Sequence, residues 1–530
     1  LADADPRVRF FAASALGRLQ VPAAFGALIE LAREVGGADR TLRHAAVMGL
    51  AGCGDEAALA GLAAHGSAAV RMAALLALRR HRSAECGRFL ADADREIVTE
   101  AARAVDDLQL ADHLPALAAL LDDRKATELP LLRRAVNVAF RLGTRDDALR
   151  LARVAAERDD LPEAIRADAL RALGEFDQPP ARDRMLGYWR PCPPRPPIGA
   201  GVLEPMLERL LASPLAELAE AAARHVEKAK LATLSPVVAA LAQDGARPPA
   251  VRIAALDALA ATGGGDLRAV VEVMLKDGND GVRGAARRHL SRLDPAQALA
   301  ILDKVLAQGS VREQQDACSI LGEMGDARAA DVLALELGRL LDGTLAPEVA
   351  LDLLQAARRK EGHERIKAQL AKHAAAKPAG DKVAALIECA AGGDARRGRR
   401  VADRQELMCF KCHKAGNEGA GEVGPDLAGI GGKRSPRELL ESIVAPNMVI
   451  AEGFAGSTLI LKGDRIVDGR ILSEDDRVVR IAGVDGNVIE VVAADVVKRR
   501  LGMSAMPEGL ADKLDPRDLR DLIAWLGSLR

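Results

Sequence analysis

The chain has 530 residues, a formal net charge of -2 and only 2% aromatic residues. The near-neutral charge gives no basis for bulk binding of nucleic acid, and no apolar run approaches the roughly 18 residues that would cross a membrane. Few aromatic residues among many alanines, leucines, arginines and acidic residues favour helices packed through small and aliphatic side chains. We therefore expect a mostly α protein with neither a nucleic-acid partner nor a transmembrane segment.

The beginning of the chain looks like the middle of a helical repeat. Residues 1–9 contain neither an initiator methionine nor a signal peptide. We expect the chain to be an N-terminally truncated part of a longer protein, so the missing signal is uninformative about location.

A short unit recurs through residues 1–375. It opens with an apolar residue and an arginine, continues as an amphipathic run rich in small residues, and ends in leucine, often with glycine after it. The clearest anchors are Val8-Arg9, Leu42-Arg43, Val70-Arg71, Ile165-Arg166, Val251-Arg252, Val282-Arg283 and Val311-Arg312. They recur at a spacing of roughly 30 residues, the two-helix period of an α-solenoid. Asp5 and Asn279 are placed to cap the helices that follow.

This pattern resembles HEAT repeats. The resemblance implies two runs of stacked helix pairs, at 1–176 and 201–375, because one pair cannot bury its apolar stripe alone. Such a solenoid could be an extended surface for a protein partner or a rigid spacer, and the sequence favours neither.

Residues 177–200 interrupt the period with a proline-rich segment that cannot be helical. It holds Tyr188, the only tyrosine of the chain, and Trp189. We expect it to cross the solenoid surface in extended form with both aromatic side chains packed in a groove, although a binding role for them stays open. Residues 376–389 are expected to be a linker to a second domain at 390–530.

The residues that carry chemistry are Cys409, Cys412 and His413, in a C-x-x-C-H motif typical of c-type haem attachment. Two thiols about one helical turn apart can form thioethers with the porphyrin vinyl groups, and the histidine can supply the proximal nitrogen. A zinc half-site would need a second ligand pair, which does not follow. A redox dithiol would need a βαβ context, and chance is the third alternative. We expect the other cysteines to be buried free thiols: Cys53, Cys86, Cys192, Cys318 and Cys389.

Several features surround this motif. Gly398 lies in a short helix before it, and a Gly-Pro-Asp-Leu run containing Pro425 and Leu427 follows it. A capped helix is expected at 435–444 with proline in its first turn. Short β-runs at 454–500, separated by turn residues, predict a small antiparallel sheet.

The last features are a methionine loop and a helix. Met506 is followed by Pro507, just before an amphipathic helix that begins after Asp515 and carries Trp525. A lone methionine can equally be core packing.

The order of these features resembles a class I cytochrome c domain, of the haem-binding type abundant in Planctomycetes and Verrucomicrobia, over about 390–530. In proteins of that type the cytochrome domain commonly follows HEAT-like repeats, which in turn follow a β-propeller dehydrogenase-like domain. The resemblance implies one covalent haem c, with its iron held by two axial ligands. In this chain Cys409 and Cys412 would attach the haem, His413 would be the proximal ligand, and Met506 the distal ligand, with Met503 and Met448 as alternatives. Pro425 would accept a hydrogen bond from the proximal histidine, Leu427 would pack on the proximal face, and Trp525 would pack against the haem edge and the first helix. The resemblance also implies that Gly398 permits a close crossing of the first and last helices of the domain.

The fold expected for the whole chain is therefore a HEAT-like α-solenoid followed by a class I cytochrome c domain with a small antiparallel β insertion. Its implied function is one-electron transfer, with a redox partner protein or a fused dehydrogenase domain as partner, in the periplasm or at the cell surface. The alternative is a HEAT-repeat interaction scaffold that carries a haem sensor. The sequence contains no Ser/His/Asp set, metal-carboxylate cluster or nucleotide loop. Whether the chain is part of an enzyme, as the electron-accepting part of a periplasmic dehydrogenase, stays open.

Four basic residues follow or fall within the motif region: Lys411, Lys414, Lys433 and Arg434. They could form a basic rim at the haem edge that steers an acidic partner. Ordinary solvated charge is the simpler interpretation and the one that we favour.

Overall fold

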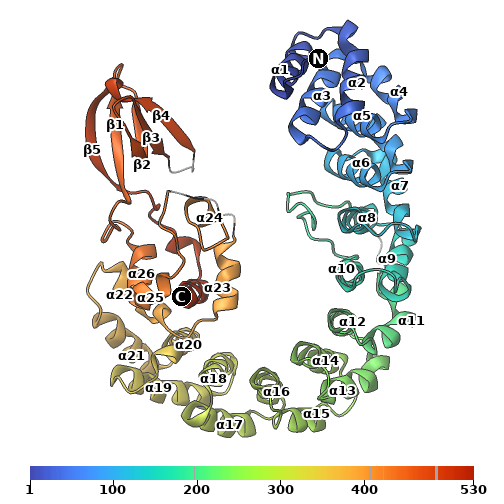
Figure 1. Cartoon of the computed structure of the whole chain (residues 1–530). Helices are drawn as coiled ribbons and strands as arrows, with labels where there is room; N and C mark the ends of the chain where they lie inside the picture. The colour runs from blue at the N-terminus through green and yellow to red at the C-terminus, as the bar shows by residue number, and fades with distance from the viewer. Residues whose placement is uncertain are drawn as a thin grey trace. The chain divides into compact units, whose positions relative to one another are not determined.

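The computed structural model describes residues 1–195, 197, 199–404, 407, 409–419, 421, 423–483 and 487–530 (Figure 1). It divides into two compact units, Leu1–Met274 and Leu275–Arg530. Helices dominate both units, and one small antiparallel sheet lies in the second. In the ranges just given, no helix is long and apolar enough to cross a membrane. The expected helical-repeat solenoid with a small antiparallel sheet is confirmed at this level.

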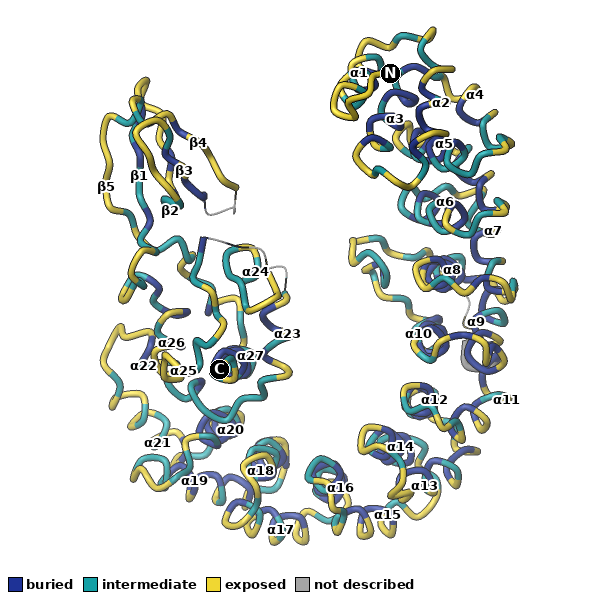
Figure 2. The backbone as a smooth tube through the Cα atoms, in the orientation of Figure 1, coloured by how far each residue is buried: buried dark blue, intermediate teal, exposed yellow. Residues whose placement is uncertain are grey.

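The first unit consists of two rows of helices. In one row each helix packs against the next, in the order α1 (Pro6–Arg18), α3 (Arg40–Cys53), α5 (Ala68–Arg80), α6 (Arg95–Leu108), α8 (Leu129–Leu142), α10 (Glu163–Gly174), α12 (Ala216–Ala229) and α14 (Pro249–Thr262). The second row packs against the first and consists of α2 (Phe25–Val35), α4 (Glu56–Gly61), the 3-10 segment η3 (Ala84–Ala91), α7 (Leu114–Ala119), α9 (Arg145–Glu157), α11 (Gly199–Leu211), α13 (Ser235–Gln243) and α15 (Leu267–Met274). Buried residues, mostly alanine and leucine, gather where the helices face each other (Figure 2).

Two of the apolar-arginine anchors show how neighbouring helices are joined. Each anchor begins within the first turn of a first-row helix or of its counterpart in the second unit. Arg166 on α10 donates its Nε–H to the carbonyl of Ala155 on α9 at 3.1 Å, and Arg252 on α14 donates to the carbonyl of Ala242 on α13, also at 3.1 Å. The arginine thus satisfies a main-chain acceptor near the end of the preceding helix, where the helix itself leaves carbonyls unpaired.

The proline-rich segment forms a short hairpin, and its aromatic side chains are not packed in a groove as the sequence predicted. An isolated bridge joins Arg182 and Trp189, and the amide of Asp183 donates to the carbonyl of Tyr188 at 2.8 Å. Tyr188 is 65% exposed and Trp189 is 73% exposed. The inner positions belong instead to the buried Asp183 and to Arg195, whose guanidinium lies over two buried phenylalanine rings.

The second unit begins with three more helix pairs and ends in a C-terminal module, which we define as residues 382–530. One row contains α16 (Asp280–Leu293), α18 (Val311–Glu323) and α20 (Pro347–Arg358), and the other contains α17 (Pro295–Gln308), α19 (Ala327–Leu341) and α21 (Glu364–Ala375). The helical part of the module consists of α22 (Lys382–Ala385), the 3-10 turn η7 (Ile387–Ala390), α23 (Ala395–Ala402), α24 (Cys409–Cys412), α25 (Ile430–Lys433), α26 (Pro436–Val444) and α27 (Pro516–Ser528).

The predicted linker at 376–389 is helical in its second half. Asp381 caps α22 by accepting the amides of Val383 and Ala384, both at 2.9 Å. Val383 and Cys389 are then buried in the core of the module. The proline, glycine and lysine residues before Asp381 suggested a linker, but the short apolar run after it has a hydrophobic core to join.

A buried carboxylate fixes the module on the last helix pair. Asp352 of α20 is 3% exposed and pairs with two arginines of α27. Its Oδ1 lies 2.9 Å from a guanidinium nitrogen of Arg517, and its Oδ2 accepts a hydrogen bond from Arg520. Solenoid and module are therefore joined by charge-assisted contacts within the second unit.

The insertion is a five-stranded antiparallel sheet in the order β4-β3-β2-β1-β5. Its strands are β1 (Ala455–Leu461), β2 (Ile466–Glu474), β3 (Val478–Ala482), β4 (Val488–Val492) and β5 (Val496–Ser504). Alternate side chains of four strands form a small core of their own, which includes Leu459, Val467, Val479 and Val491. The predicted strands at 454–500 are present, and β5 continues past the predicted boundary to Ser504.

Candidate functional site

Two helices that cross closely form the base of the C-terminal module. α23 and α27 meet at Gly398, where a Cβ atom would overlap the main-chain carbonyl of Asp521. The Asp521 carboxylate accepts the Nε–H of Arg397 at 2.6 Å and the amide of Asp394 at 2.7 Å. Any residue other than glycine would push the helices apart, so the close crossing predicted at Gly398 is present.

The C-x-x-C-H motif lies on the single turn α24 and directly after it. The amide of His413 donates to the carbonyl of Cys409 at 2.9 Å, which closes the turn. The ring of Phe410 contacts the ring of Trp525 edge to face, with 5.9 Å between centroids, and the guanidinium of Arg399 lies 4.7 Å from the Phe410 centroid. The C-x-x-C-H motif does not itself fix the residue at position 410, but in the structure Phe410 holds the motif against α27.

The imidazole of His413 has a fixed orientation. Its Nδ1 lies 2.8 Å from the carbonyl oxygen of Pro425. A carbonyl can only accept, so Nδ1 carries the proton and Nε2 of the neutral ring keeps its lone pair. Burial lowers the pKa of His413, which favours this neutral form. Gly424 packs on the ring, and a Cβ atom there would lie 2.5 Å from Cε1 of the imidazole.

The two thiols of the motif lie in an apolar setting. Burial raises the pKa of Cys409 to about 11 and also raises the pKa of Cys412. Redox-active dithiols instead have lowered thiol pKa values in electropositive surroundings. Across the part of the chain that the structure describes, no group of three or more His, Cys, Asp and Glu side chains could hold a metal ion. Of the other cysteines, Cys192 is half-buried, and the following are buried as predicted: Cys53, Cys86, Cys318 and Cys389.

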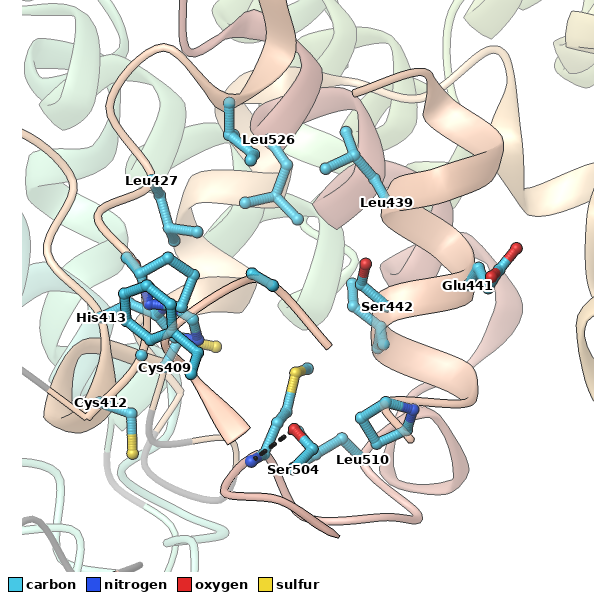
Figure 3. Close-up of a pocket in the computed structure, with 18 of the residues that line it drawn as sticks. Cys409, Cys412, His413, Leu427, Leu439, Glu441, Ser442, Ser504, Leu510 and Leu526 are labelled. Atoms are coloured by element: carbon cyan, nitrogen blue, oxygen red, sulfur yellow. Dashed lines mark hydrogen bonds between the residues drawn. The ribbon is translucent and has the colours of Figure 1, made fainter. Parts of the chain in front are cut away.

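A cavity of about 410 Å³ opens between these elements. This volume lies within the range of roughly 300–1,000 Å³ typical of small-molecule and cofactor sites. In Figure 3, Cys409, Cys412 and His413 lie on one side of the pocket, with α26 across from them. The apolar lining comes from several elements and includes Leu407, Val423, Ile430, Leu439, Ile443, Ile450, Phe454, Leu510, Leu514, Leu522 and Leu526.

The cavity brings together every site residue that the sequence singled out. Its lining includes Cys409, Cys412, His413, Pro425, Leu427, Met506 and Trp525. Of the three candidate methionines, only Met506 belongs to it. Met448, after the end of α26, is 65% exposed, and Met503, in β5, is 69% exposed.

Sequence reasoning missed the contacts that hold the Met506 loop. Asn447 accepts the amide of Ser504 at 2.8 Å and donates to Glu508 at 2.6 Å. The hydroxyl of Ser504 accepts the amide of Met506 at 3.1 Å (dashed in Figure 3). The only signal in the sequence is an asparagine placed directly after the proline that follows α26.

The four basic residues near the motif do not act as one set of free charges. Lys411, Lys433 and Arg434 are exposed. Arg434 pairs with Glu438 at 3.1 Å within α26 and its N-terminal turn, and Lys414 has interactions of its own. A basic rim that steers a partner therefore gains no particular support, in line with the simpler interpretation.

Comparison with known proteins gives distant structural likenesses, and the architecture rests on the helix pairing described above. No protein-family model and no curated protein matches the chain. Among solved structures it is similar to the CpcE–CpcF complex of phycocyanin lyase from Nostoc sp. PCC7120, with 19% identity over 54% of this chain and 92% of that chain, and a TM-score of 0.25. It is also similar to the karyopherin Kap121p bound to the extreme C-terminus of the protein phosphatase Cdc14p, with 13% identity over 74% of this chain and 48% of that chain, and a TM-score of 0.46. Human deoxyhypusine hydroxylase shares 16% identity over 66% of this chain and 100% of that chain, with a TM-score of 0.21.

These likenesses are too distant to carry a function. The class of protein, a helical-repeat solenoid with a small antiparallel sheet, follows from the helix pairing described above. The function has to be argued from the cavity itself.

Proposed function

We propose that the C-terminal module binds one haem c covalently and carries one electron, like the class I cytochrome c domains that its motif order resembles. The observation that carries the proposal is the shared cavity. Cys409, Cys412 and His413 line it together with Met506, although Met506 lies far along the chain on the other side of the β insertion. Two thiols, an imidazole and a thioether form the donor set of a covalently attached haem with histidine and methionine axial ligands.

The residues around the cavity fit such a group. Cys409 and Cys412 would form the two thioether links, and His413 would bind the iron through Nε2, because its Nδ1 proton is held by Pro425. Met506 would be the distal ligand. When bound, the group supplies an iron that changes its oxidation state by one electron.

The surrounding side chains would set the environment of that iron. Leu427, Trp525 and the apolar wall of α26 line the cavity and would limit the access of water. A hydrophobic shell of this kind influences the reduction potential. No residue of the module is assigned a catalytic role, so any dehydrogenase activity would belong to a partner protein or a fused domain.

The proposal has consequences for location and partners. Covalent haem attachment of this type takes place outside the bacterial cytoplasm, so we propose the periplasm or the cell surface. The electron partner would be a redox protein or a fused dehydrogenase domain, and the solenoid would hold the module in place.

The experiment is expression of the full chain with the c-type haem maturation machinery, followed by intact-mass spectrometry. We expect the mass of one haem to be added to the wild type and to Cys192→Ala, a control that removes a cysteine from the first unit. The double variant Cys409→Ala and Cys412→Ala should carry no covalent haem. Haem that remains on the double variant would contradict the assignment of the two cysteines.

An interaction scaffold that carries a haem sensor is the second candidate. The hairpin of the first unit favours a scaffold, because Tyr188 and Trp189 are largely exposed and such residues dominate many protein–protein interfaces. Carbon monoxide discriminates between the two roles of the haem. Rapid binding to the reduced wild type would indicate an exchangeable sixth site and a sensor, whereas no binding would favour electron transfer through a methionine-ligated iron.

A further inference from the structure

The β insertion leaves and re-enters the helical part of the module at two residues that touch each other. The chain departs after Asn447 and returns at Ser504, the last residue of β5. Asn447 Oδ1 accepts the Ser504 amide at 2.8 Å. This side-chain contact lies at the base of the insertion, where Ser504 also pairs with Ala455 of β1, directly beside the loop that carries Met506.

Asn447 also reaches the far side of this loop. Its Nδ2 donates to Oε1 of Glu508 at 2.6 Å, while the Ser504 hydroxyl accepts the Met506 amide at 3.1 Å. Met506 thus lies between two residues, 504 and 508, that are both bound by the same asparagine. A loop without helix or strand needs such contacts, because its backbone otherwise keeps conformational freedom.

The position of Asn447 is itself well determined. α26 ends at Val444, and the buried Pro446 precedes the asparagine. Proline restricts both its own φ angle and the residue before it. The amide group is consequently presented from the end of a helix whose other residues line the cavity, including Leu439 and Ile443.

We infer that Asn447 is a positioning residue for Met506: by binding the loop on both sides of the methionine, it holds Met506 at the cavity. The effect of this positioning on function rests on the proposed haem site, in which Met506 is the distal ligand. The role requires an amide, because one atom must accept from Ser504 and the other must donate to Glu508. A carboxylate at this position could only accept, and it would face Glu508 with like charge.

The first test uses the matured full chain and four proteins: wild type, Asn447→Asp, the double variant Asn447→Asp with Glu508→Gln, and Thr458→Ala. Thr458 donates to Asp468 at 2.5 Å within the sheet, so the loss of this hydrogen bond is a matched control. All four should carry covalent haem. In Asn447→Asp, the fraction of reduced haem that binds carbon monoxide should rise about tenfold, since a lost hydrogen bond to a charged group costs about 1.4 kcal/mol or more. The glutamine of the double variant restores a donor and should return the fraction to near the wild-type value.

A second readout does not need the haem. In the unmatured full chain, amide hydrogen exchange at Ser504 and Met506 should be about tenfold faster in Asn447→Ala than in wild type, and unchanged in Thr458→Ala. Unchanged exchange would overturn the inference whatever the haem result. Covalent haem with unaltered carbon monoxide binding in Asn447→Asp would overturn the effect on ligation and leave the proposed function standing. Absence of covalent haem from the wild type would refute the proposed function, while the exchange data would still decide whether Asn447 positions the loop.

Discussion

The solenoid and the C-terminal module are held together in different ways. In the solenoid one type of contact recurs: Arg166 and Arg252 each bind a carbonyl of the preceding helix in the same geometry. In the module each decisive contact occurs once and joins distant parts of the chain, as Gly398 does with Asp521 and Asn447 does with Ser504. Repeated contacts spread stability along the chain, whereas the module depends on single residues.

The largest effect is expected where the two regions meet. Asp352→Ala removes the partner of Arg520, which is 3% exposed, and leaves a buried guanidinium without its carboxylate. We expect the unfolding free energy of the second unit to fall by about 3–5 kcal/mol, measured by chemical denaturation. Glu323→Ala is the matched control, because it breaks an ion pair with Arg359 in which both side chains are nearly half exposed. That change should be within about 0.5 kcal/mol, and equal losses for both variants would contradict the account.

The buried His225 of the first unit sharpens the comparison through the pH dependence of stability. His413 in the module donates to Pro425, whereas the ring of His225 in α12 has no hydrogen-bond partner among the residues that the structure describes. Burial lowers the pKa of His225 from 6.5 to about 4. Between these pH values the unfolded state binds the proton more tightly, so the stability of the first unit falls as the pH falls.

The contribution of His225 is complete above pH 6.5 and amounts to about 3 kcal/mol, lost by about pH 4. Thermal unfolding of wild type and His225→Leu, followed by circular dichroism across this range, isolates it from other titrating groups. The difference in unfolding temperature between wild type and His225→Leu should change with pH. Parallel profiles would show that His225 is protonated as easily in the folded chain as in the unfolded one.

Gly398 tests whether the module depends on a single close approach. Gly398→Ala should lower the unfolding free energy of the module by about 1–3 kcal/mol, because the methyl group has no room against Asp521. Gly527→Ala in α27 is the control: a Cβ atom there would meet nothing within 4 Å, so alanine should raise the unfolding free energy by up to about 1 kcal/mol. The fluorescence of Trp525 reports on the module in a Trp189→Phe background, since the chain has two tryptophans. If both variants changed the unfolding free energy in the same direction, the close crossing at Gly398 would be refuted.

The smallest effect is expected at the hairpin of the first unit. Tyr188→Ala with Trp189→Ala should change the stability of this unit by no more than about 0.5 kcal/mol, because both side chains are mostly exposed. Thermal unfolding gives the measurement. A loss of several kcal/mol would instead support the packed groove that the sequence suggested.

The sequence was most informative where a pattern is either repeated or chemically constrained. The apolar-arginine anchors predicted the helix pairs, and the C-x-x-C-H motif pointed to residues that line one cavity. Met506 could be named in advance because a proline follows it, but only its place in the cavity separates it from Met448 and Met503.

Other features could not be predicted, for definite physical reasons. Trp189 is exposed, while Asp183 of the same segment is buried and Arg195 lies over the Phe176 ring, and no local pattern distinguishes these positions. The helix at 382–385 forms because Val383 has a hydrophobic core to join. The contacts of Asn447 connect residues separated by the β insertion, and no local pattern records such a pairing.

The absorption spectrum of the chain, matured in a periplasm with the c-type machinery, tests the central claim most directly. With dithionite we expect the sharp α-band of a low-spin haem, and the haem should stay with the protein during extraction with acidified acetone. Met506→Ala should keep the covalent haem and lose the low-spin spectrum. A wild-type chain without covalent haem would contradict the account and leave a helical-repeat protein whose apolar cavity serves another ligand.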